Sequence, residues 1–491
     1  MCKLACVGLS ISLLLLSGCG MVVKTFKPAP PPASWTEPLP SAQAHDGKLS
    51  ELKNWWQQFN DPELIKLIEA AQAVSADIEA AKARIVASQA AVAVTEAQLL
   101  PSINAEASAS RSKNGVVFPT ANAVSGDVNA SWELDVWGKN KADNNEEQAK
   151  LTSVKALWHD ARIIVAAETA KQYINFRLCE NLTDIAQKNV DSTNKTEQLS
   201  QLTGKAGFLA SSSLSQSEGQ AAEAANQLKR RLLQCTLIVK SLVAITAIPE
   251  PELRDILAKN ARIIPMPAGI AVATVPAKML EQRPDVLSAE RNVAAASFEI
   301  KYAVAQRYPR LSLAGSIGLT YDTSARNLVF NRRGTALDGL TWSIGPLAVS
   351  LPLFDAGVRE ANIDAAKAQY EAAKSVYESV VRNAVREVEE ALATLNSTTL
   401  REIDVRKAAN QFEISYKASE ARYQASLANL FELEEARRES LQADTNVFTL
   451  QNERVLAWIS LYHAMGGGWV VAQNTLPQDK PILILDRELK L

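Results

Sequence analysis

Cys19 is the first residue whose chemistry the sequence suggests, because it closes a short hydrophobic leader. Residues 1–3 carry one positive charge, and residues 7–16 form an apolar run too short to cross a bilayer as a helix. The run ends in Leu16-Ser17-Gly18-Cys19, which resembles a bacterial lipobox, where small residues precede a cysteine that receives a lipid. We interpret residues 1–18 as a signal peptide and Cys19 as the lipid attachment site. The alternative is an ordinary signal peptide that contains a cysteine.

The residues after Cys19 are typical of a tether. Gly20 follows the cysteine, whereas an aspartate there would indicate retention at the inner membrane, so the sequence is compatible with transport to the outer membrane. A covalent lipid adds membrane affinity without a spanning helix. Six prolines lie between positions 28 and 40, and they favour an extended, semi-rigid segment. We therefore expect residues 19–48 to form a lipid anchor and tether.

Two more cysteines could react with each other. Cleavage before Cys19 removes Cys2 and Cys6, which leaves Cys179 and Cys235 in the body of the chain. These two flank a predicted helical turn at about 26 and about 30 residues from its centre, so antiparallel pairing would place them at similar heights. A disulfide is possible in an oxidising compartment. Two buried free thiols are the alternative.

Residue patterns for catalysis or metal binding are absent from the sequence. His45, His159 and His463 lie far apart and share no nearby cluster of acidic or cysteine ligands. The run at 466–468 is three glycines, but no Lys-Ser/Thr follows, so a helix stop is the better interpretation. No Ser/His/Asp grouping with a nucleophile signature is visible. The net charge of -2 gives no basic field for nucleic acid. We expect a protein without cofactor or metal that is not an enzyme.

Long helices dominate the predicted structure. Residues 139–202 and 357–424 contain no proline, and their single glycine is Gly357 at the start of the second segment. At about 1.5 Å per residue, roughly 65 residues make a rod of about 95 Å. Turns at 203–207 and 424–428 precede further helical runs at 208–247 and 429–465. The sequence therefore predicts two antiparallel helical hairpins.

Four segments alternate between apolar and polar residues, as half-buried strands do. They are residues 102–110, 128–136, 310–321 and 340–353. A soluble half-buried sheet and a membrane barrel with a wet lumen both fit this alternation. After the leader, no stretch of about 18 apolar residues remains, so a membrane crossing would need a closed barrel. Four strands cannot close around a lumen, which predicts an oligomer.

The chain also repeats itself. The order helix, strand, strand, long helix, long helix occurs twice, with a period of about 200 residues. We assign a first structural repeat to residues 49–270, with its strand pair at about 100–137 and its hairpin at about 139–247. A second repeat occupies residues 271–470, with strands at about 309–354 and a hairpin at about 357–465. Residues 471–491 form a C-terminal tail.

Five motifs in order carry a family resemblance across nearly the whole mature chain. They are WWQQFNDPEL at 55–64, WELDVWG at 132–138, QRPDV at 282–286, LPLFDAG at 351–357 and LYHAMGGGW at 461–469. With the lipobox and the two-fold repeat, they resemble the TolC-type outer membrane factors, specifically the lipoprotein branch that partners resistance-nodulation-division pumps.

The resemblance implies a mixed, mainly-α fold with membrane β structure. A homotrimer would form a twelve-stranded outer-membrane β-barrel, with four strands per chain, continuous with a long periplasmic α-helical barrel. Such a protein is an efflux duct that passively conducts substrates delivered by an inner-membrane pump and a periplasmic adaptor (a membrane fusion protein). It would lie in the outer membrane, lipid-anchored, and extend into the periplasm. The cargo stays open between drug, solvent, metal and metabolite.

The resemblance also implies a periplasmic gate beside the second hairpin turn. The family pattern places an acidic residue and, three residues on, an arginine there, which correspond to Glu435 and Arg438. One helical turn apart, they share a face and could pair between subunits. Glu432 and Glu434 would add negative charge near the opening and favour cations, or would form a solvated face.

Two positions depart from the family pattern near the turns, and two other classes of protein compete with the duct. Ser426 stands where the family usually has a glycine, and Ser213 replaces a common aspartate. A periplasmic, lipid-anchored coiled-coil adaptor would also contain a helical hairpin, although it does not account for two hairpins and two strand pairs. A lipid-anchored enzyme would need a catalytic constellation.

Overall fold

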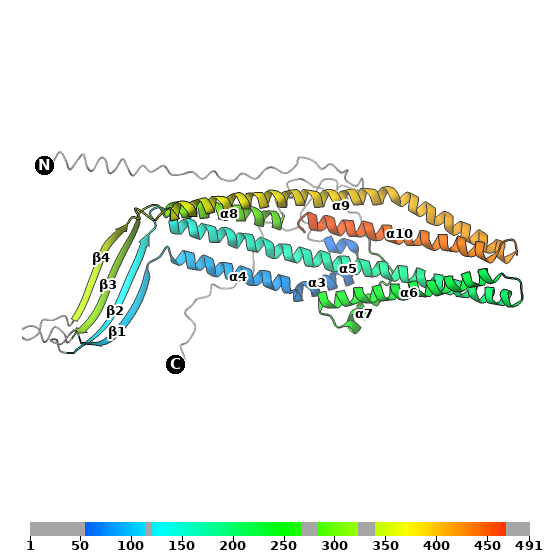
Figure 1. Ribbon diagram of the computed structural model, residues 1–491, viewed down its shortest axis with the longest axis horizontal. Coiled ribbons are helices and arrows are strands. Elements are labelled where there is room, and N and C mark those ends of the chain that lie inside the picture. The colour runs from blue at the N-terminus through cyan, green and yellow to red at the C-terminus, as the bar shows by residue number, and fades with distance from the viewer. Residues whose placement is uncertain (1–54, 114–119, 268–279, 281–282, 323–338, 468–491) are drawn as a thin grey trace, which may run out of the picture. The chain divides into compact units, whose positions relative to one another are not determined.

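The computed structural model describes residues 55–113, 120–267, 280, 283–322 and 339–467 (Figure 1). The predicted signal peptide, Cys19, the tether and the C-terminal tail lie outside these ranges. The described chain forms two compact units, of which the first holds residues 87–152 and 290–375 and the second holds the rest. Each unit contains residues from both sequence repeats, so the repeats and the compact units divide the chain differently.

The helices occupy most of the described chain. The predicted helices at 139–202, 208–247, 357–424 and 429–465 are confirmed to within three residues at each end. Their bounds, with those of the shorter helices, are η1 Trp55–Phe59, α3 Pro62–Val74, α4 Ala76–Ala97, α5 Lys139–Lys205, α6 Ser211–Thr246, α7 Glu250–Ala258, α8 Pro284–Ala305, α9 Val358–Gln424 and α10 Leu430–Ala464. In the described residues no single helix has the length and apolar character to cross a membrane, although α6 and α7, bent by 113°, meet both criteria as a pair.

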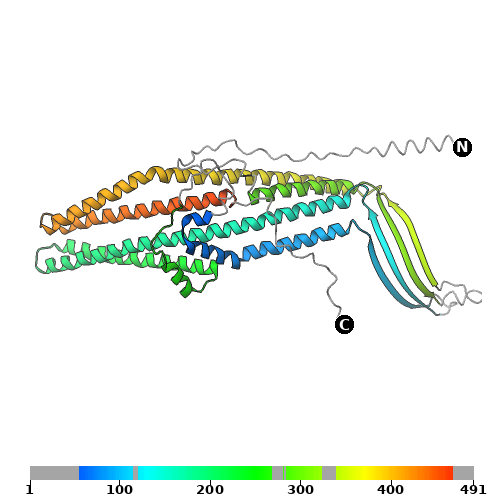
Figure 2. The ribbon, with the colours of Figure 1, turned by 180° about the vertical axis from the view of Figure 1, so that it is seen from behind.

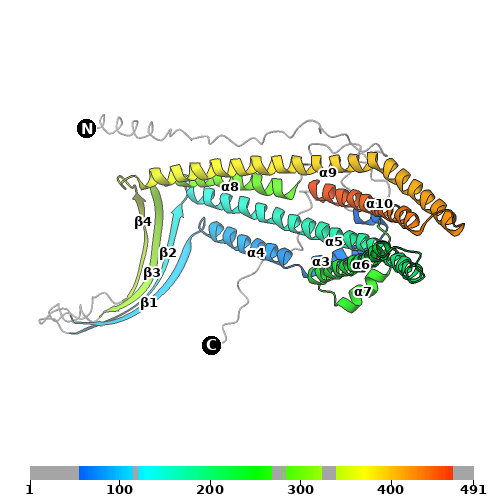
Figure 3. The same cartoon turned by 45° about the vertical axis from the view of Figure 1, so that its right-hand side comes forward.

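The first unit contains a curved four-stranded antiparallel sheet (Figure 3). Its strands, in the order β1-β2-β3-β4, are β1 Ser102–Ser112, β2 Ala121–Leu134, β3 Arg310–Asp322 and β4 Gly339–Ser350. The predicted strand pairs are present, with two corrections. β2 begins seven residues before the expected 128, where it pairs with the end of β1. β4 ends at Ser350 rather than 353, because Pro352 has no N–H group for a ladder hydrogen bond.

A bulge in β4 keeps the apolar residues on one face. Leu313 pairs with Leu347, but Gly315 pairs with Ile344, so β4 carries one more residue than β3 across this interval. The apolar residues of β4 therefore stand at even-numbered positions before the bulge and at odd-numbered positions after it. The apolar members of that face are Ile103, Ala105, Ala107, Ala109, Val124, Val128, Ala130, Trp132, Leu134, Leu311, Leu313, Ile317, Leu319, Tyr321, Leu340, Trp342, Ile344, Leu347 and Val349.

The opposite face of the sheet is polar. Serine hydroxyls from neighbouring strands hydrogen-bond across it, between Ser108 and Ser125 at 2.9 Å and between Ser316 and Ser343 at 2.8 Å. Many of the large side chains on the apolar face are exposed; Trp342, for example, is 71% exposed. Contact between an apolar surface of this size and water is unfavourable. A sheet with one polar face and one exposed apolar face therefore fits a membrane environment.

The same elbow joins strand to long helix in both repeats. Asp135 accepts hydrogen bonds from the backbone N–H groups of Asn140 and Lys141 at the start of α5. Asp355 does the same for Arg359 at the start of α9. Gly138 and Gly357 follow with φ of 73° and 87°, a conformation that favours glycine. The motifs WELDVWG and LPLFDAG are therefore one capping device used twice.

An aromatic pair connects the two repeats inside the first unit. The indole of Trp137, which follows β2, stacks on Tyr308 with ring centroids 4.9 Å apart. Its Nε1 donates a hydrogen bond to the carbonyl of Pro309, just before β3. This contact positions the end of one strand pair against the beginning of the other.

A buried polar cluster fixes the short helices of the second unit. Asp61 caps α3 and also accepts a 2.5 Å hydrogen bond from the hydroxyl of Tyr173 in α5. Arg177 donates to that hydroxyl and to the carbonyls of Leu257 and Lys259 at the end of α7. Burial raises the pKa of Tyr173, which keeps the phenol protonated. The cluster explains the NDPEL motif as a cap that fastens α3 to α5.

The end of α10 packs closely on its neighbours. Arg283, in the QRPDV motif, binds Asp285 and Glu387 and donates to the carbonyl of Ala464. Gly466 and Gly467 follow with φ of 77° and 60°, which confirms the predicted helix stop.

We predict that Gly467→Ala lowers the thermal unfolding midpoint, because the added Cβ would lie 2.6 Å from Ile163 Cγ1 in α5 at a positive φ. Overpacking of this kind costs about 1–3 kcal/mol. Gly219→Ala is the matched control, since a Cβ there meets nothing within 4 Å in helix α6 and should be neutral or stabilising by up to about 1 kcal/mol. Equal midpoints for the two variants would contradict the packing argument.

Candidate functional site

The two hairpin tips share one backbone motif. At the end of α5, Phe208 N–H bonds the carbonyl of Thr203, and Gly207 N–H bonds that of Gly204. At the end of α9, Leu427 and Ser426 make the corresponding bonds to Arg422 and Tyr423. This is the Schellman arrangement, which requires a left-handed residue after the helix.

The left-handed position differs between the tips. Gly207 has φ of 78°, and Ser426 has φ of 60°. A non-glycine residue in this conformation is strained by about 1–2 kcal/mol. Ser426, where the resemblance led us to expect a glycine, therefore occupies a position whose geometry favours glycine, yet the turn keeps the same hydrogen bonds.

Helix α10 begins beyond the second tip with a side-chain cap from Asn429. Asn429 Oδ1 accepts from the N–H of Glu432 at 2.9 Å, and Asn429 Nδ2 donates to Glu432 Oε1 at 3.0 Å. Glu432, predicted to line the gate, is exposed and holds the start of the helix. In the first hairpin, Ala210 at the equivalent cap makes no side-chain hydrogen bond, and Ser213 donates only its N–H to the carbonyl of Ala210.

Glu435 and Arg438 form an exposed ion pair one turn apart on α10. Their side chains are 56% and 58% exposed, respectively. An exposed pair of this kind contributes little to folding, about 0–1 kcal/mol. The two groups predicted to form the gate thus pair with each other and are both accessible.

Glu434 and Arg437 lie on the other side of α10 and contact α5. Arg437 binds Glu434 at 2.5 Å and donates to the carbonyl of Lys188 at 3.1 Å. Ser192 donates to Glu434 at 3.0 Å. The side chains of Arg437 and Glu434 are only 8% and 13% exposed. The prediction of Glu434 as a solvated or opening-facing charge is corrected, because this contact, which we call the α5–α10 latch, buries it.

Two grooves run beside α10. One, of about 590 Å³, lies between α5, α6 and α10. The other, of about 570 Å³, lies between α9 and α10. Arg438 lines both of them, and Arg437 lines the first. Arg438 is therefore placed where α10 meets open space on either side.

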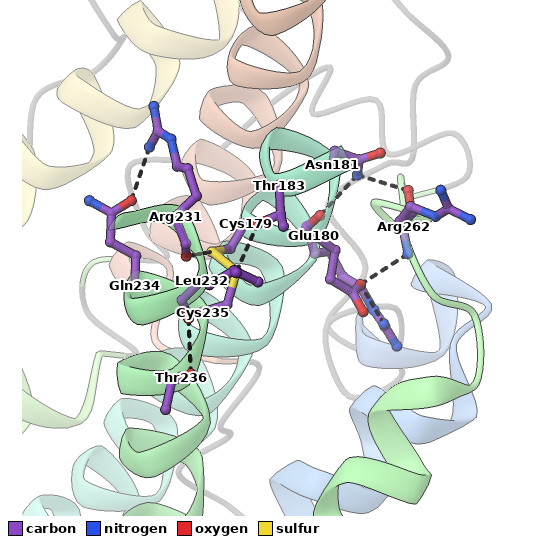
Figure 4. Close-up of a disulfide and its surroundings, with 11 residues drawn as sticks. Cys179, Glu180, Asn181, Thr183, Arg231, Leu232, Gln234, Cys235, Thr236 and Arg262 are labelled. Carbon is purple, nitrogen blue, oxygen red and sulfur yellow. Dashed lines mark hydrogen bonds and ion pairs between the residues drawn. A yellow bond between two sulfur atoms is a disulfide. The ribbon is translucent and has the colours of Figure 1, made fainter. Parts of the chain in front are cut away.

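The predicted cysteine pair is joined as a disulfide between α5 and α6 (Figure 4). The Cα atoms of Cys179 and Cys235 are 5.6 Å apart, and 56 residues separate them in sequence. Thr183, one turn along α5, donates its hydroxyl to the sulfur of Cys235 at 3.4 Å. Cys179 is buried and Cys235 is half-buried.

His159 and His463 stay apart from these sites, and the described residues contain no group of three or more His, Cys, Asp or Glu that could hold a metal. Burial and the charge of Asp285 raise the pKa of Asp160, near Arg283, to about 6. Burial lowers the pKa of His463, which keeps the imidazole neutral near neutral pH.

We predict that Arg437→Met destabilises the second unit by about 3–5 kcal/mol, since it leaves the buried Glu434 carboxylate without its partner. Arg438→Met is the matched control on the same helix and should change stability by less than about 1 kcal/mol. Thermal or denaturant unfolding of both variants checks this. The double variant Glu434→Gln with Arg437→Met should recover part of the loss, and an additive result would argue against a coupled latch.

The family model described as outer membrane efflux protein matches residues 67–247 and 275–467, which cover most of both repeats. Nodulation protein T of Rhizobium leguminosarum bv. viciae is 27% identical over 470 residues, covering 95% of this chain and 94% of the relative. The solvent efflux pump outer membrane protein SrpC of Pseudomonas putida is 26% identical, covering 94% and 98%.

Solved structures share the fold. The outer-membrane channel OprN superposes with a TM-score of 0.76 at 23% identity, covering 89% of this chain and 98% of that one. The outer membrane protein VceC of Vibrio cholerae superposes with a TM-score of 0.75 at 24% identity, covering 85% and 99%. Since the family model covers well over half of the sequence, the chain belongs to the outer membrane efflux protein family.

Proposed function

We propose that this protein is the outer-membrane duct of a tripartite export pump and conducts substrates passively out of the cell. The observation that carries this is the family match across both repeats, together with a sheet that has one polar and one exposed apolar face. The adaptor alternative is not favoured, because it accounts for neither the four-stranded sheet nor the second hairpin.

The free edges of the sheet support a homotrimer. β1 and β4 are each paired on one side only within the chain. Exposed strand edges attract further strands. Three copies would join β4 of one protomer to β1 of the next and close twelve strands around a lumen lined by the polar face.

The helices of the second unit offer two edges as well. Contacts connect α6 to α5, α5 to α10, and α10 to α9, which leaves α6 and α9 at the ends of the row (Figure 2). Both end helices expose apolar side chains, which are Leu232, Leu233 and Leu237 on α6 and Leu400, Ile403 and Ile414 on α9. A cyclic trimer joins two different faces at each contact, as an α6 edge against an α9 edge would provide.

The tips supply a surface for the periplasmic partners. Phe208 and Leu427, at matching places in the two turns, are 86% and 70% exposed. Exposed apolar side chains at both tips suit the docking of an adaptor. The adaptor is the membrane fusion protein that would connect the duct to a resistance-nodulation-division pump. Relatives are named for solvent and cation efflux, so the cargo of this chain is an export substrate delivered by its pump.

The leader sequence supports a location at the outer membrane. We infer that Cys19 carries a covalent lipid and anchors the tether in the outer membrane, with the helices extending into the periplasm. The motif Leu16-Ser17-Gly18-Cys19 supports this assignment.

The test of the duct is migration of the protein purified from outer membranes. We expect a trimer-sized, heat-modifiable band, because the closed sheet resists detergent until it is heated. Leu237→Lys should weaken this band by placing a charge in the proposed α6–α9 contact, whereas Glu218→Lys, on α6 but outside the apolar set, is the control. A monomer found in the inner membrane or the periplasm would count against the duct.

The gate has its own test. We predict that Glu435→Ala or Arg438→Ala raises single-channel conductance in planar bilayers, because each removes one partner of an exposed pair that could bridge neighbouring subunits. Lys417→Ala, in the exposed Glu413–Lys417 pair of α9, is the control and should leave conductance unchanged. Unchanged conductance in both α10 variants would remove Glu435 and Arg438 from the gate.

A further inference from the structure

The two hairpins correspond residue by residue. Gly207 and Ser426 hold the left-handed position of each tip and are 219 residues apart. The same offset relates the caps of α6 and α10, which are Ala210 and Asn429. Applied to the cysteines, it pairs Cys179 with Thr398 and Cys235 with Arg454. The disulfide of the first hairpin thus has a defined counterpart in the second.

That counterpart is a hydrogen-bonded ion pair. Arg454 in α10 donates to the carbonyl of Thr398 in α9 at 2.7 Å and to Glu402 at 2.6 Å. Thr398 is fully buried, and Arg454 and Glu402 are partly buried. Hydrogen bonds from Arg454 hold the pKa of Glu402 below its ordinary value, so the carboxylate stays charged. We call this contact the Arg454 staple.

The first hairpin has no ion pair at the positions that correspond to Glu402 and Arg454, because Thr183 and Cys235 stand there. The offset makes Thr183 the counterpart of Glu402. Thr183 donates its hydroxyl to the sulfur of Cys235, whereas Glu402 accepts from the guanidinium of Arg454. The covalent bond therefore occupies the position where the second hairpin uses charge. Both contacts join the same two faces of an antiparallel helix pair at the same distance from the tip.

We propose that the Cys179–Cys235 disulfide is a redox-set staple that fixes the first hairpin, in the place where the Arg454 staple fixes the second without covalent chemistry. One hairpin then depends on thiol oxidation and the other does not. The oxidising compartment rests on the proposed function, whereas the staple itself rests on the hairpin geometry.

The chemistry of the staple is thiol–disulfide exchange. Two cysteine thiols lose two protons and two electrons as the S–S bond forms, and a disulfide of an exchange protein or small-molecule oxidant is reduced to two thiols. A dithiol reductant reverses the step and is itself oxidised to a disulfide. Cys235 is half-buried whereas Cys179 is buried, so Cys235 is the more accessible residue of the pair.

Hydrogen–deuterium exchange on the full-length protein in detergent tests the proposal, and each molecule contains its own control. We expect dithiothreitol to raise amide exchange in α6 around Cys235 by about tenfold, with α10 around Arg454 unchanged. Arg454→Met should do the reverse. Thiol counting by mass accompanies both measurements. Two free thiols in the unreduced protein, or equal α6 exchange with and without reductant, would overturn the proposal.

A transplant variant supplies the sharper test. Cys179→Thr with Thr183→Glu and Cys235→Arg builds the Arg454 staple into the first hairpin. Dithiothreitol should not change the amide exchange rate in α6 of this variant. That rate should lie closer to the rate of the oxidised wild-type protein than the rate of the Cys179→Ser, Cys235→Ser control does. Exchange as fast as the control would overturn the equivalence of the two staples. The readout is independent of conductance, so a failed duct and a failed staple are distinguishable.

Discussion

Unpaired backbone groups along β1 and β4 are the constraint from which the rest of the molecule follows. A four-stranded sheet leaves two rows of N–H and C=O groups open, and water or another strand must satisfy them. One face of this sheet is apolar, so the edges lie beside a surface that water does not favour. Further strands with the same apolar and polar faces would pair the open edges and continue the apolar face at the same time. The bulge in β4 matters for this reason, because without it the edge strand would turn its apolar residues to the polar face beyond Gly345.

The internal repeat supplies each local solution twice, with different side chains. An aspartate caps the long helix at both elbows, and a left-handed residue ends the long helix at both tips. The backbone geometry is retained where the side chains have diverged, as Gly207 and Ser426 show. Conformation is thus the shared property of the repeats, whereas charge and covalent chemistry distinguish them.

The elements, the two strand pairs and the two helical hairpins were predictable from the sequence, whereas the bulge in β4 and the contact between α10 and α5 were not. The long helices were predictable because proline is absent from them and glycine marks their ends, and the strands were predictable because period-2 alternation is strong. The bulge was not, since alternation alone shows a change of parity near Gly345 without its cause. Glu434 was misplaced for a related reason. Its α5 partner Ser192 lies 242 residues earlier in the chain, so only the packing of α10 on α5 reveals which face of α10 is buried.

The charged residues 434–438 of α10 form two ion pairs on different sides of the helix, one buried and one exposed. Glu434 and Arg437 face α5 in the same chain and connect the second hairpin to the first. Glu435 and Arg438 are each one residue further on, turned by about 100° to the open side. Rotation of α10 that opened an intersubunit pair would therefore also move the latch, because the two pairs share one rigid backbone. A gate built on Glu435 and Arg438 alone would be exposed and weak, and the buried latch would give such a gate a fixed position from which to act.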